Sequence, residues 1–301
     1  MKPIVIKPAN REDWLKARED GIGASEVAAV VGLSPWETPF SLWLRKTHQA
    51  PPLEETESMH MGHLLEPVVV QLWEEKTGWK AVKASAKDII YQDPEHPWRK
   101  VTPDRIAYEV DENGKKNKVL LEIKTSALDF DPEDLPVYYL AQCQYQMHVT
   151  GIHVCYLCWL VNGRHFGYAR LDYDQPFAEY LIKNIDEYYN DCVVGGKEPE
   201  CISVSDFTIK GSDPGTTIEA DEKALAQLLS LRTLNIAHAE REAEIESYKD
   251  SIKLFMGQME SLTYEGKVIA TWKTDARSRT LRLKNKVIDE LINNKEVSNG
   301  D

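Results

Sequence analysis

Apolar side chains recur at helical spacing in several separate segments of the chain, and these segments predict helices. Ser25 is expected to cap a short helix that ends near Gly32. Thr38 is expected to cap the next helix, with Pro39 at its first position. The predicted helices cover residues 11–20, 25–32, 38–47, 59–76, 134–149, 175–192 and 219–260, and a further one lies at the C-terminal end.

Between these helices the pattern changes to short runs that are rich in β-forming residues and are bounded by turn signals. The dipeptide Asn162-Gly163 is a strong hairpin signal. A glycine-containing stretch near residue 200 marks a boundary, after which charged helix dominates, so we expect a domain over 1–205 and an accessory module of helix and small β pieces over 206–301. The predicted strands are 88–92, 98–104, 105–110, 119–125, 153–161, 164–171, 267–274 and 279–283.

The composition is that of an ordinary globular protein, with 42% hydrophobic and 28% charged residues among 301. No apolar run approaches the ~20 residues of a membrane span, and five cysteines in this length do not form a disulfide framework. We therefore expect a cytoplasmic protein with reduced thiols and no membrane partner.

The net charge of −13 argues against a broadly basic nucleic-acid binder and directs attention to local patches. The clearest patch is a late stretch opposed only by Asp275. Its basic residues are Lys267, Lys273, Arg277, Arg279, Arg282, Lys284 and Lys286. In strands, Arg277, Arg279 and Lys273 are expected to line one face that suits backbone phosphates. An oligomerisation or partner-docking arm is the alternative.

The segment VLLEIKT places Glu122 and Lys124 on one face of a predicted strand, with Leu121 and Ile123 on the other. Asp104 lies 18 residues before Glu122, in VTPDR, across a predicted hairpin. Two carboxylates and the Ile123 carbonyl make an oxygen-rich site that suits Mg²⁺. Taken alone, the Glu/Lys pair favours a solvated strand face, and the preceding Pro-Asp with a hairpin turn between them reverses that preference.

Pro-Asp followed by Glu-x-Lys across a hairpin resembles the PD-(D/E)xK nuclease core. The resemblance extends, over roughly residues 11–200, to the YqaJ-type phage recombination exonucleases, which include lambda exonuclease. It rests on the order of WLKAREDGIGASEV, MGHLLEP, VTPDR, LLEIKT and YLAQCQYQMHVTG. The resemblance implies an α/β fold with a central mixed sheet flanked by helices. It also implies Mg²⁺-dependent phosphodiester hydrolysis, with Mn²⁺ as a substitute, and a ring-shaped trimer threaded by DNA.

By position, the resemblance makes Asp104 and Glu122 metal ligands and Lys124 the catalytic lysine. Glu66 in MGHLLEP matches the helix glutamate of the family's site, where it supports a metal or its water; otherwise it is a solvent-facing helix residue. The implied function is a 5′→3′ double-strand exonuclease, encoded by a phage or prophage in a bacterial host. It would leave a 3′ single strand for a single-strand annealing protein.

Arg18 and Ser25 form a second constellation. A helix that starts at Ser25 offers free N–H groups to an anion, and an arginine binds phosphate with two hydrogen bonds. In the resembled family, residues at these positions hold the terminal 5′-phosphate. Thr102, where the family more often has serine, and Gln142 match other residues of that pocket. A surface salt bridge is the alternative for Arg18, and a helix-surface amide the alternative for Gln142.

Other signals carry less weight. The Cys-x-x-Cys of Cys155 and Cys158 lies in a buried strand pattern and favours packing. Trp36, Trp43 and Trp73 are expected in the core.

Two competing functions remain open. One is an endonuclease of restriction or repair on the same core, which has no use for an end-phosphate pocket. The other is a non-catalytic DNA-binding assembly protein, which has no use for an intact Asp104, Glu122 and Lys124.

Overall fold

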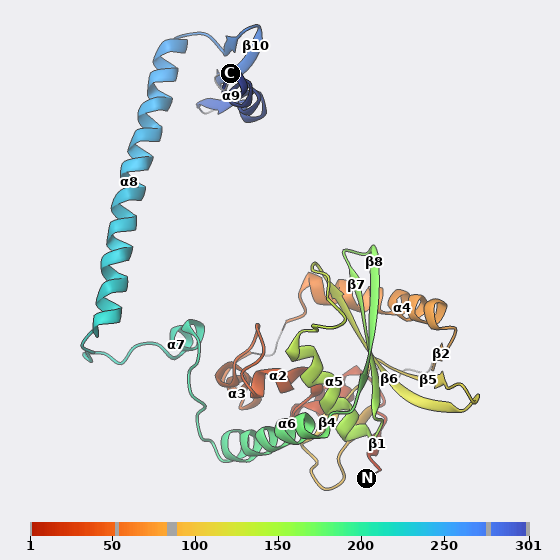
Figure 1. The fold of residues 1–301 in the computed structure, drawn as a ribbon. Helices are drawn as coiled ribbons and strands as arrows, with labels where there is room; N and C mark the ends of the chain where they lie inside the picture. The colour runs from red at the N-terminus through yellow and green to blue at the C-terminus, as the bar shows by residue number, and fades with distance from the viewer. Residues whose placement is uncertain (1, 52–53, 83–88, 275–277, 299–301) are drawn as a thin grey trace. The chain divides into compact units, whose positions relative to one another are not determined.

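The computed structural model describes residues 2–51, 54–82, 89–274 and 278–298. Contacts divide the chain into two compact units, Met1–Asp213 and Pro214–Asp301 (Figure 1). Helix α7 (Val204–Lys210) belongs to the first unit, since its buried Asp206 accepts a hydrogen bond from Thr38 Oγ1 at 2.6 Å. The limit predicted between residues 205 and 206 runs through this helix, and the domain division stays a prediction.

The first unit is built on a five-stranded mixed sheet in the order β2-β5-β6-β7-β8. β6 and β7 are parallel, and the other neighbouring pairs are antiparallel. The predicted hairpin joins β7 to β8, and the Arg164 N–H donates to the Val161 carbonyl at 2.9 Å across its turn. Asn162 and Gly163 have φ values of 48° and 67°, and positive φ at both central residues is what a type I′ turn requires. The strands are β2 (Lys80–Ala81), β5 (Arg105–Val110), β6 (Lys116–Ser126), β7 (Val154–Val161) and β8 (His165–Asp172).

Helices cover both faces of this sheet, which confirms the predicted α/β class (Figure 1). Helix α4 (Glu57–Thr77) packs Val69 and Trp73 against Leu121 on one face. Helix α5 (Val137–Thr150) packs Cys143 and Met147 against Leu120 on the other. The alternation of side chains along β6 therefore divides its residues between two cores, as the period of a strand predicts.

A third core lies beyond α5, between α5 and helices from both ends of the unit. These are α2 (Val27–Val30), α3 (Pro39–Lys46) and α6 (Gln175–Glu187), the last continued by the π-helix η3 (Tyr188–Val194), whereas α1 (Arg11–Glu19) has no buried residue. A small antiparallel sheet of β1 (Ile4–Ile6), β3 (Ile90–Gln92) and β4 (Lys100–Val101) adjoins them. Ile22 forms a parallel bridge with Arg99, which attaches the segment after α1 to β4.

Ser25 is not the cap of its helix, contrary to the prediction. A 3-10 helix (η1, Ala24–Glu26) leads into α2, and Gly23 is its capping residue. The physical reason is Glu26, whose carboxylate accepts the Gly23 N–H at 2.8 Å and thereby starts the helix two residues earlier. Ser25 lies exposed in the first turn.

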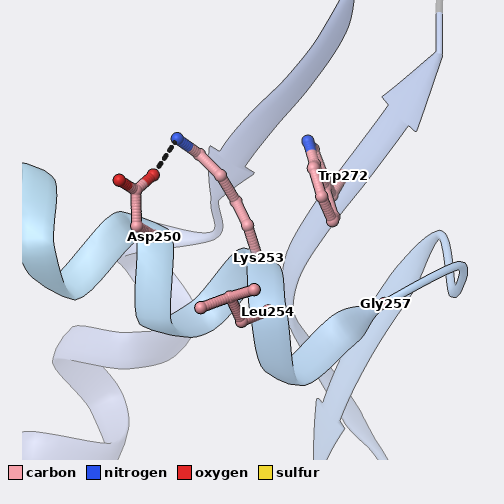
Figure 2. A pocket seen from close by; sticks show the side chains of 5 residues that line it. All are labelled: Asp250, Lys253, Leu254, Gly257 and Trp272. Carbon is pink, nitrogen blue, oxygen red and sulfur yellow. Dashed lines mark hydrogen bonds and ion pairs between the residues drawn. The ribbon is translucent and has the colours of Figure 1, made fainter.

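The second unit joins the 35-residue helix α8 (Glu222–Met256) to a three-stranded antiparallel sheet, as expected for a helical module with small β pieces. Met256 and Ala270 are buried between them. A pocket of about 370 Å³ lies at the end of α8, and Figure 2 shows the residues that line it, which are Asp250, Lys253, Leu254, Gly257 and Trp272. The remaining elements are β9 (Ser261–Tyr264), β10 (Lys267–Thr274), β11 (Arg279–Leu283) and α9 (Asn285–Ser298).

The prediction that Lys273 and Arg279 line one basic face of this sheet is wrong. Thr274 pairs with Arg279 and Lys273 pairs with Thr280, so Lys273 and Arg279 lie on opposite faces. The guanidinium of Arg279 stacks on Trp272 at 3.7 Å and donates to the carbonyls of Gly257 and Met259. Arg279 thus caps the C-terminal end of α8. Arg277 lies outside the described residues.

Buried packing of the cysteine pair is confirmed, because Cys155 and Cys158 are fully buried in cores on opposite faces of the sheet. Trp43 and Trp73 are core residues as expected, whereas Trp36 is 71% exposed in the loop between α2 and α3. None of the helices in the described ranges combines the length and the apolar composition needed to cross a membrane.

Candidate active site

The chain brings Asp104, Glu122 and Lys124 together at one end of the central sheet. Asp104 immediately precedes β5, and its Oδ2 accepts the backbone N–H of Ile123 at 2.8 Å. Glu122 and Lys124 lie on the α5 face of β6, and Lys124 Nζ donates to Glu122 Oε1 at 2.6 Å. The hairpin inferred from the sequence therefore places both predicted carboxylates and the lysine in one cluster.

Helix α5 supplies the amides that hold Glu122. Gln142 Nε2 donates to Glu122 Oε1 at 2.5 Å, and Gln146 Nε2 donates to Oε2 at 2.7 Å. The side chain of Glu122 is 3% exposed, so these contacts and Lys124 compensate for the loss of water. Gln142, predicted to line a phosphate pocket, also accepts from Lys124 Nζ at 3.0 Å. Sequence reasoning missed Gln146, although it follows Gln142 by one helical turn.

Glu66 reaches the cluster from α4 on the other face of the sheet. It is buried, forms an ion pair with Arg105, and lies close enough to Asp104 to influence its ionisation. Arg105 Nη1 also donates to the carbonyl of Asp104 at 2.5 Å. Arg105 was not predicted as part of the site; it connects the helix glutamate to the backbone that carries Asp104.

The cluster has more negative charge than its lysine balances. Burial raises the pKa of Asp104 well above its usual range, and Glu122 and Glu66 raise it further, against Lys124 and the Ile123 N–H. Burial lowers the pKa of Lys124, but Glu122 and Asp104 outweigh burial and leave this pKa raised. Lys124 is therefore a cation at neutral pH, and an additional cation would stabilise ionised Asp104.

The donor set fits a hard divalent cation. Within the described residues no three side chains of His, Cys, Asp and Glu converge to form a metal site by themselves. The donors are the carboxylates of Asp104 and Glu122 and the carbonyl of Ile123, which leaves the same edge of β6 as the N–H that Asp104 accepts. Mg²⁺ commonly takes one or two carboxylates and keeps several waters, so this oxygen-only set suits it.

Ser25 and Thr102, two of the predicted phosphate-binding residues, follow two segments that meet at a parallel bridge between Ile22 and Arg99. After the bridge the first segment enters η1 at Ala24, and the second passes through β4 to Thr102, two residues before Asp104. Tyr145 Oη of α5 donates to the Ile22 carbonyl at 3.0 Å and holds this segment against the helix. Thr102 is half-buried and Ser25 is exposed.

Arg18 stacks on Trp14 with its Cζ 4.2 Å from the ring centre. Its Nη2 would be 3.3 Å from a Cβ at Gly23, so the missing side chain gives the guanidinium room. Arg18 forms no ion pair within the described residues, and the salt bridge considered as its alternative role is absent there. Burial lowers the pKa of Arg18, with Arg11 and Arg45 acting in the same direction against Glu26, but a guanidinium remains charged.

The neighbouring charges leave the Arg18 region net positive. Glu26 is buried and already pairs with Lys46 at 2.8 Å and Arg45 at 2.9 Å. Arg45 also pairs with Glu37 at 3.0 Å. Three cations therefore face two carboxylates, and Arg18 is the cation without a carboxylate partner in the described part of the chain. Such a partly buried guanidinium suits an anionic ligand.

Comparison with known proteins places these residues in context. Residues 13–153 match the YqaJ-like viral recombinase domain. The uncharacterized protein YqaJ of Bacillus subtilis (strain 168) is 32% identical over 197 residues, which are 63% of this chain and 59% of that protein. An uncharacterized protein of Acanthamoeba polyphaga mimivirus is 25% identical over 154 residues, which are 48% of this chain and 27% of its own length. The matches thus span less than two thirds of either relative.

Two solved structures are similar to part of this chain. The alkaline exonuclease LHK-Exo from Laribacter hongkongensis is 17% identical, with a TM-score of 0.48 over 62% of this chain and 93% of that one. A phage-related exonuclease from Haemophilus somnus is 10% identical, with a TM-score of 0.40 over 59% of this chain and 96% of that one.

Proposed function

We propose that this protein, whose residues 13–153 match the YqaJ-like viral recombinase domain, is a Mg²⁺-dependent nuclease that hydrolyses DNA phosphodiester bonds. The observation that carries the proposal is the convergence of Asp104, Glu122 and Lys124 at the end of β5 and β6. Two carboxylates and an ammonium in one half-buried cluster match what phosphodiester hydrolysis requires, namely a cation site and a positive charge beside the phosphate.

Asp104, Glu122 and the Ile123 carbonyl would hold the cation, which when bound polarises a phosphate oxygen and makes water more acidic. Gln142 and Gln146 fix the Glu122 carboxylate so that it need not reorganise during the reaction. In the hydrolysis a water oxygen forms a bond to phosphorus and gives up a proton to solvent, while the P–O bond to the leaving oxygen breaks and that oxygen takes up a proton. Lys124 would donate hydrogen bonds to the scissile phosphate and stabilise the negative charge that develops in this step. Glu66 and Arg105 position Asp104 from the other face. We expect Mn²⁺ to substitute for Mg²⁺.

We further propose that the enzyme degrades duplex DNA 5′→3′ from ends that carry a 5′-phosphate. Support comes from Arg18, a half-buried guanidinium of α1 without a carboxylate partner in the described residues, whose Nη2 lies against Gly23, two residues before Ser25. Gln142 would link this phosphate site to Glu122 and Lys124. The product would be a 3′ single strand for a single-strand annealing protein, and we propose a ring-shaped trimer as the working assembly.

Replacing Arg18 with alanine should slow cleavage of 5′-phosphorylated duplex ends by roughly 10- to 150-fold, the ~1.5–3 kcal/mol of a hydrogen bond to a charged group. Cleavage of 5′-hydroxyl ends should change much less, because the lost contact exists only with the phosphate. The measurement is a rate comparison on otherwise identical linear duplexes. Arg11→Ala is the matched control, since Arg11 is exposed and stacks on the same Trp14 ring at 4.7 Å.

Equal slowing of both substrates would make Arg18 a structural residue and would remove the support for 5′ polarity. Cleavage of covalently closed circular DNA by the wild-type protein would support the endonuclease alternative instead. A protein that binds duplex but cuts neither form in Mg²⁺ would be an assembly protein.

For the second unit we propose docking of another protein chain rather than a grip on DNA. The first half of α8 carries large apolar side chains that are each at least 44% exposed, which is an unusual density for a solvated helix. They are Leu225, Leu228, Leu229, Leu231, Leu234 and Ile236. Arg279, one of the three basic residues expected to line a DNA-binding face, instead donates to the carbonyls at the end of α8.

Truncation after Asp213 should therefore leave cleavage of short duplexes and its salt dependence unchanged, and should alter the oligomeric mass or the binding of an annealing protein. Light scattering measures the oligomeric mass, and DNA binding across a salt series measures the salt dependence. Each lost phosphate contact would lower the slope of log K against log salt by about 0.9. If truncation flattens the slope of log K against log salt and leaves the oligomeric mass unaltered, the second unit binds DNA and the docking proposal is wrong.

A further inference from the structure

A ladder of aromatic rings leads from the core of the first unit to its surface beside Lys124. Trp159 is 2% exposed and contacts Phe130, with ring centres 5.6 Å apart. Phe130 contacts Tyr139 at 5.7 Å, and Tyr139 contacts Tyr138 at 4.5 Å. The ladder ends at Trp36, which meets Tyr138 edge-on at 5.0 Å and is 71% exposed.

The buried end of the ladder is fixed in place. Trp159 pairs across the sheet with Gly167, where a Cβ would lie 2.4 Å from the indole, so only glycine lets the ring lie flat there. Trp159 Nε1 donates to Asp129 Oδ1 at 3.1 Å and so also holds the loop that carries Phe130. The rings nearer the surface therefore rest on a rigid base.

The loop that presents Trp36 is also held. Ser34 Oγ accepts the N–H groups of Trp36 and Glu37, each at 3.2 Å, and Glu37 pairs with Arg45 of α3. The loop therefore holds the Trp36 indole in a fixed position with most of its surface in water, where a ligand can reach it.

The ladder touches the candidate active site directly. Lys124 Nζ lies 5.0 Å from the centre of the Tyr139 ring and 2.6 Å from Glu122 Oε1. Tyr139 is in turn 6.4 Å from Trp36 between ring centres. Only the Tyr139 ring thus lies between Trp36 and Lys124, and this separation is comparable to the length of one nucleotide.

We propose that Trp36 and Tyr138 form a stacking platform for one nucleobase of an unpaired nucleotide in the strand being cleaved. The inference rests on the proposed nuclease function and adds the part of the substrate that this surface recognises. Stacking on an aromatic face holds a base without regard to its sequence, as a non-specific nuclease requires. An unpaired base at the platform would keep its own phosphate close to Lys124.

The test compares two 5′-phosphorylated duplexes that differ in one feature: the nucleotides at the 5′ end either carry bases or are abasic. Trp36→Ala should lower kcat/KM on the duplex with bases by about 5- to 150-fold, the range for loss of one base–aromatic stack. On the abasic duplex the same substitution should have little effect. Trp36→Phe should retain most of the activity, since a stacking face remains.

Tyr180→Ala is the matched control, because Tyr180 is 51% exposed on α6 and should affect neither substrate. Equal losses for Trp36→Ala on both duplexes, or no loss on either, would overturn the platform. Unaltered cleavage together with a changed oligomeric mass would assign Trp36 to a protein contact and also overturn it. If the wild-type protein cleaves neither duplex in Mg²⁺, the proposed nuclease function itself has failed.

Discussion

Replacing Asp104 with asparagine is expected to lower DNA cleavage by about 1000-fold or more while the protein remains folded. The substitution conserves shape but removes a charged metal donor, and a bound metal supplies several kcal/mol of transition-state stabilisation. Asp104 is half-buried and held by a single backbone N–H from Ile123, so its amide analogue should fit. Single-turnover cleavage with increasing Mg²⁺ measures the loss.

Two further measurements separate metal binding from folding. Ca²⁺ should support DNA binding but not cleavage, because it prefers more ligands at longer distances than Mg²⁺. Asp93→Asn is the matched control: Asp93 is a buried carboxylate that pairs with Arg99 at 2.7 Å outside the site. That variant should melt at a lower temperature yet cleave DNA normally when folded.

Glu122→Gln should be as inactive as Asp104→Asn but less stable. Glu122 accepts hydrogen bonds from Lys124, Gln142 and Gln146, and an amide oxygen can replace only part of that set. Near-normal cleavage by the Asp104 variant, or cleavage by the wild-type protein in excess chelator, would show that this cluster does not hold the metal.

The arrangement along β6 was predictable from sequence because it depends on a local period. Alternation alone sends Leu121 and Ile123 to the α4 face and Glu122 and Lys124 to the α5 face. The turn chemistry of Asn162-Gly163 likewise determines the β7–β8 hairpin without help from distant residues.

Contacts between distant segments were not predictable in this way. Gln146 becomes part of the site because α5 packs on one particular face of the sheet, and the pairing of Arg105 with Glu66 joins residues of β5 and α4. The helix start at Gly23 depends on the carboxylate of Glu26, which competes with the hydroxyl of Ser25 as the capping group.

Trp36 and Lys273 show why a local pattern can also mislead. Trp36 has helical neighbours on both sides, yet the Ser34 turn directs its loop outward. The faces of Lys273 and Arg279 depend on the register between β10 and β11, which their own sequences leave open.

Replacing Lys124 with methionine is expected to lower the cleavage rate at saturating Mg²⁺ by about 100- to 1000-fold, the usual cost of losing one preorganised electrostatic donor. Methionine has a similar length and can keep the contact with Tyr139, so the fold should be retained. The half-saturating Mg²⁺ concentration should fall, because a competing cation 2.6 Å from Glu122 has been removed.

A lower cleavage rate together with a lower Mg²⁺ requirement separates two roles of the lysine. If Lys124 served only to hold Glu122 in place, its loss would raise the Mg²⁺ requirement and leave the saturated rate nearly intact. Lys124→Arg keeps the positive charge and should recover part of the rate, which identifies the charge rather than the shape as the contribution to cleavage.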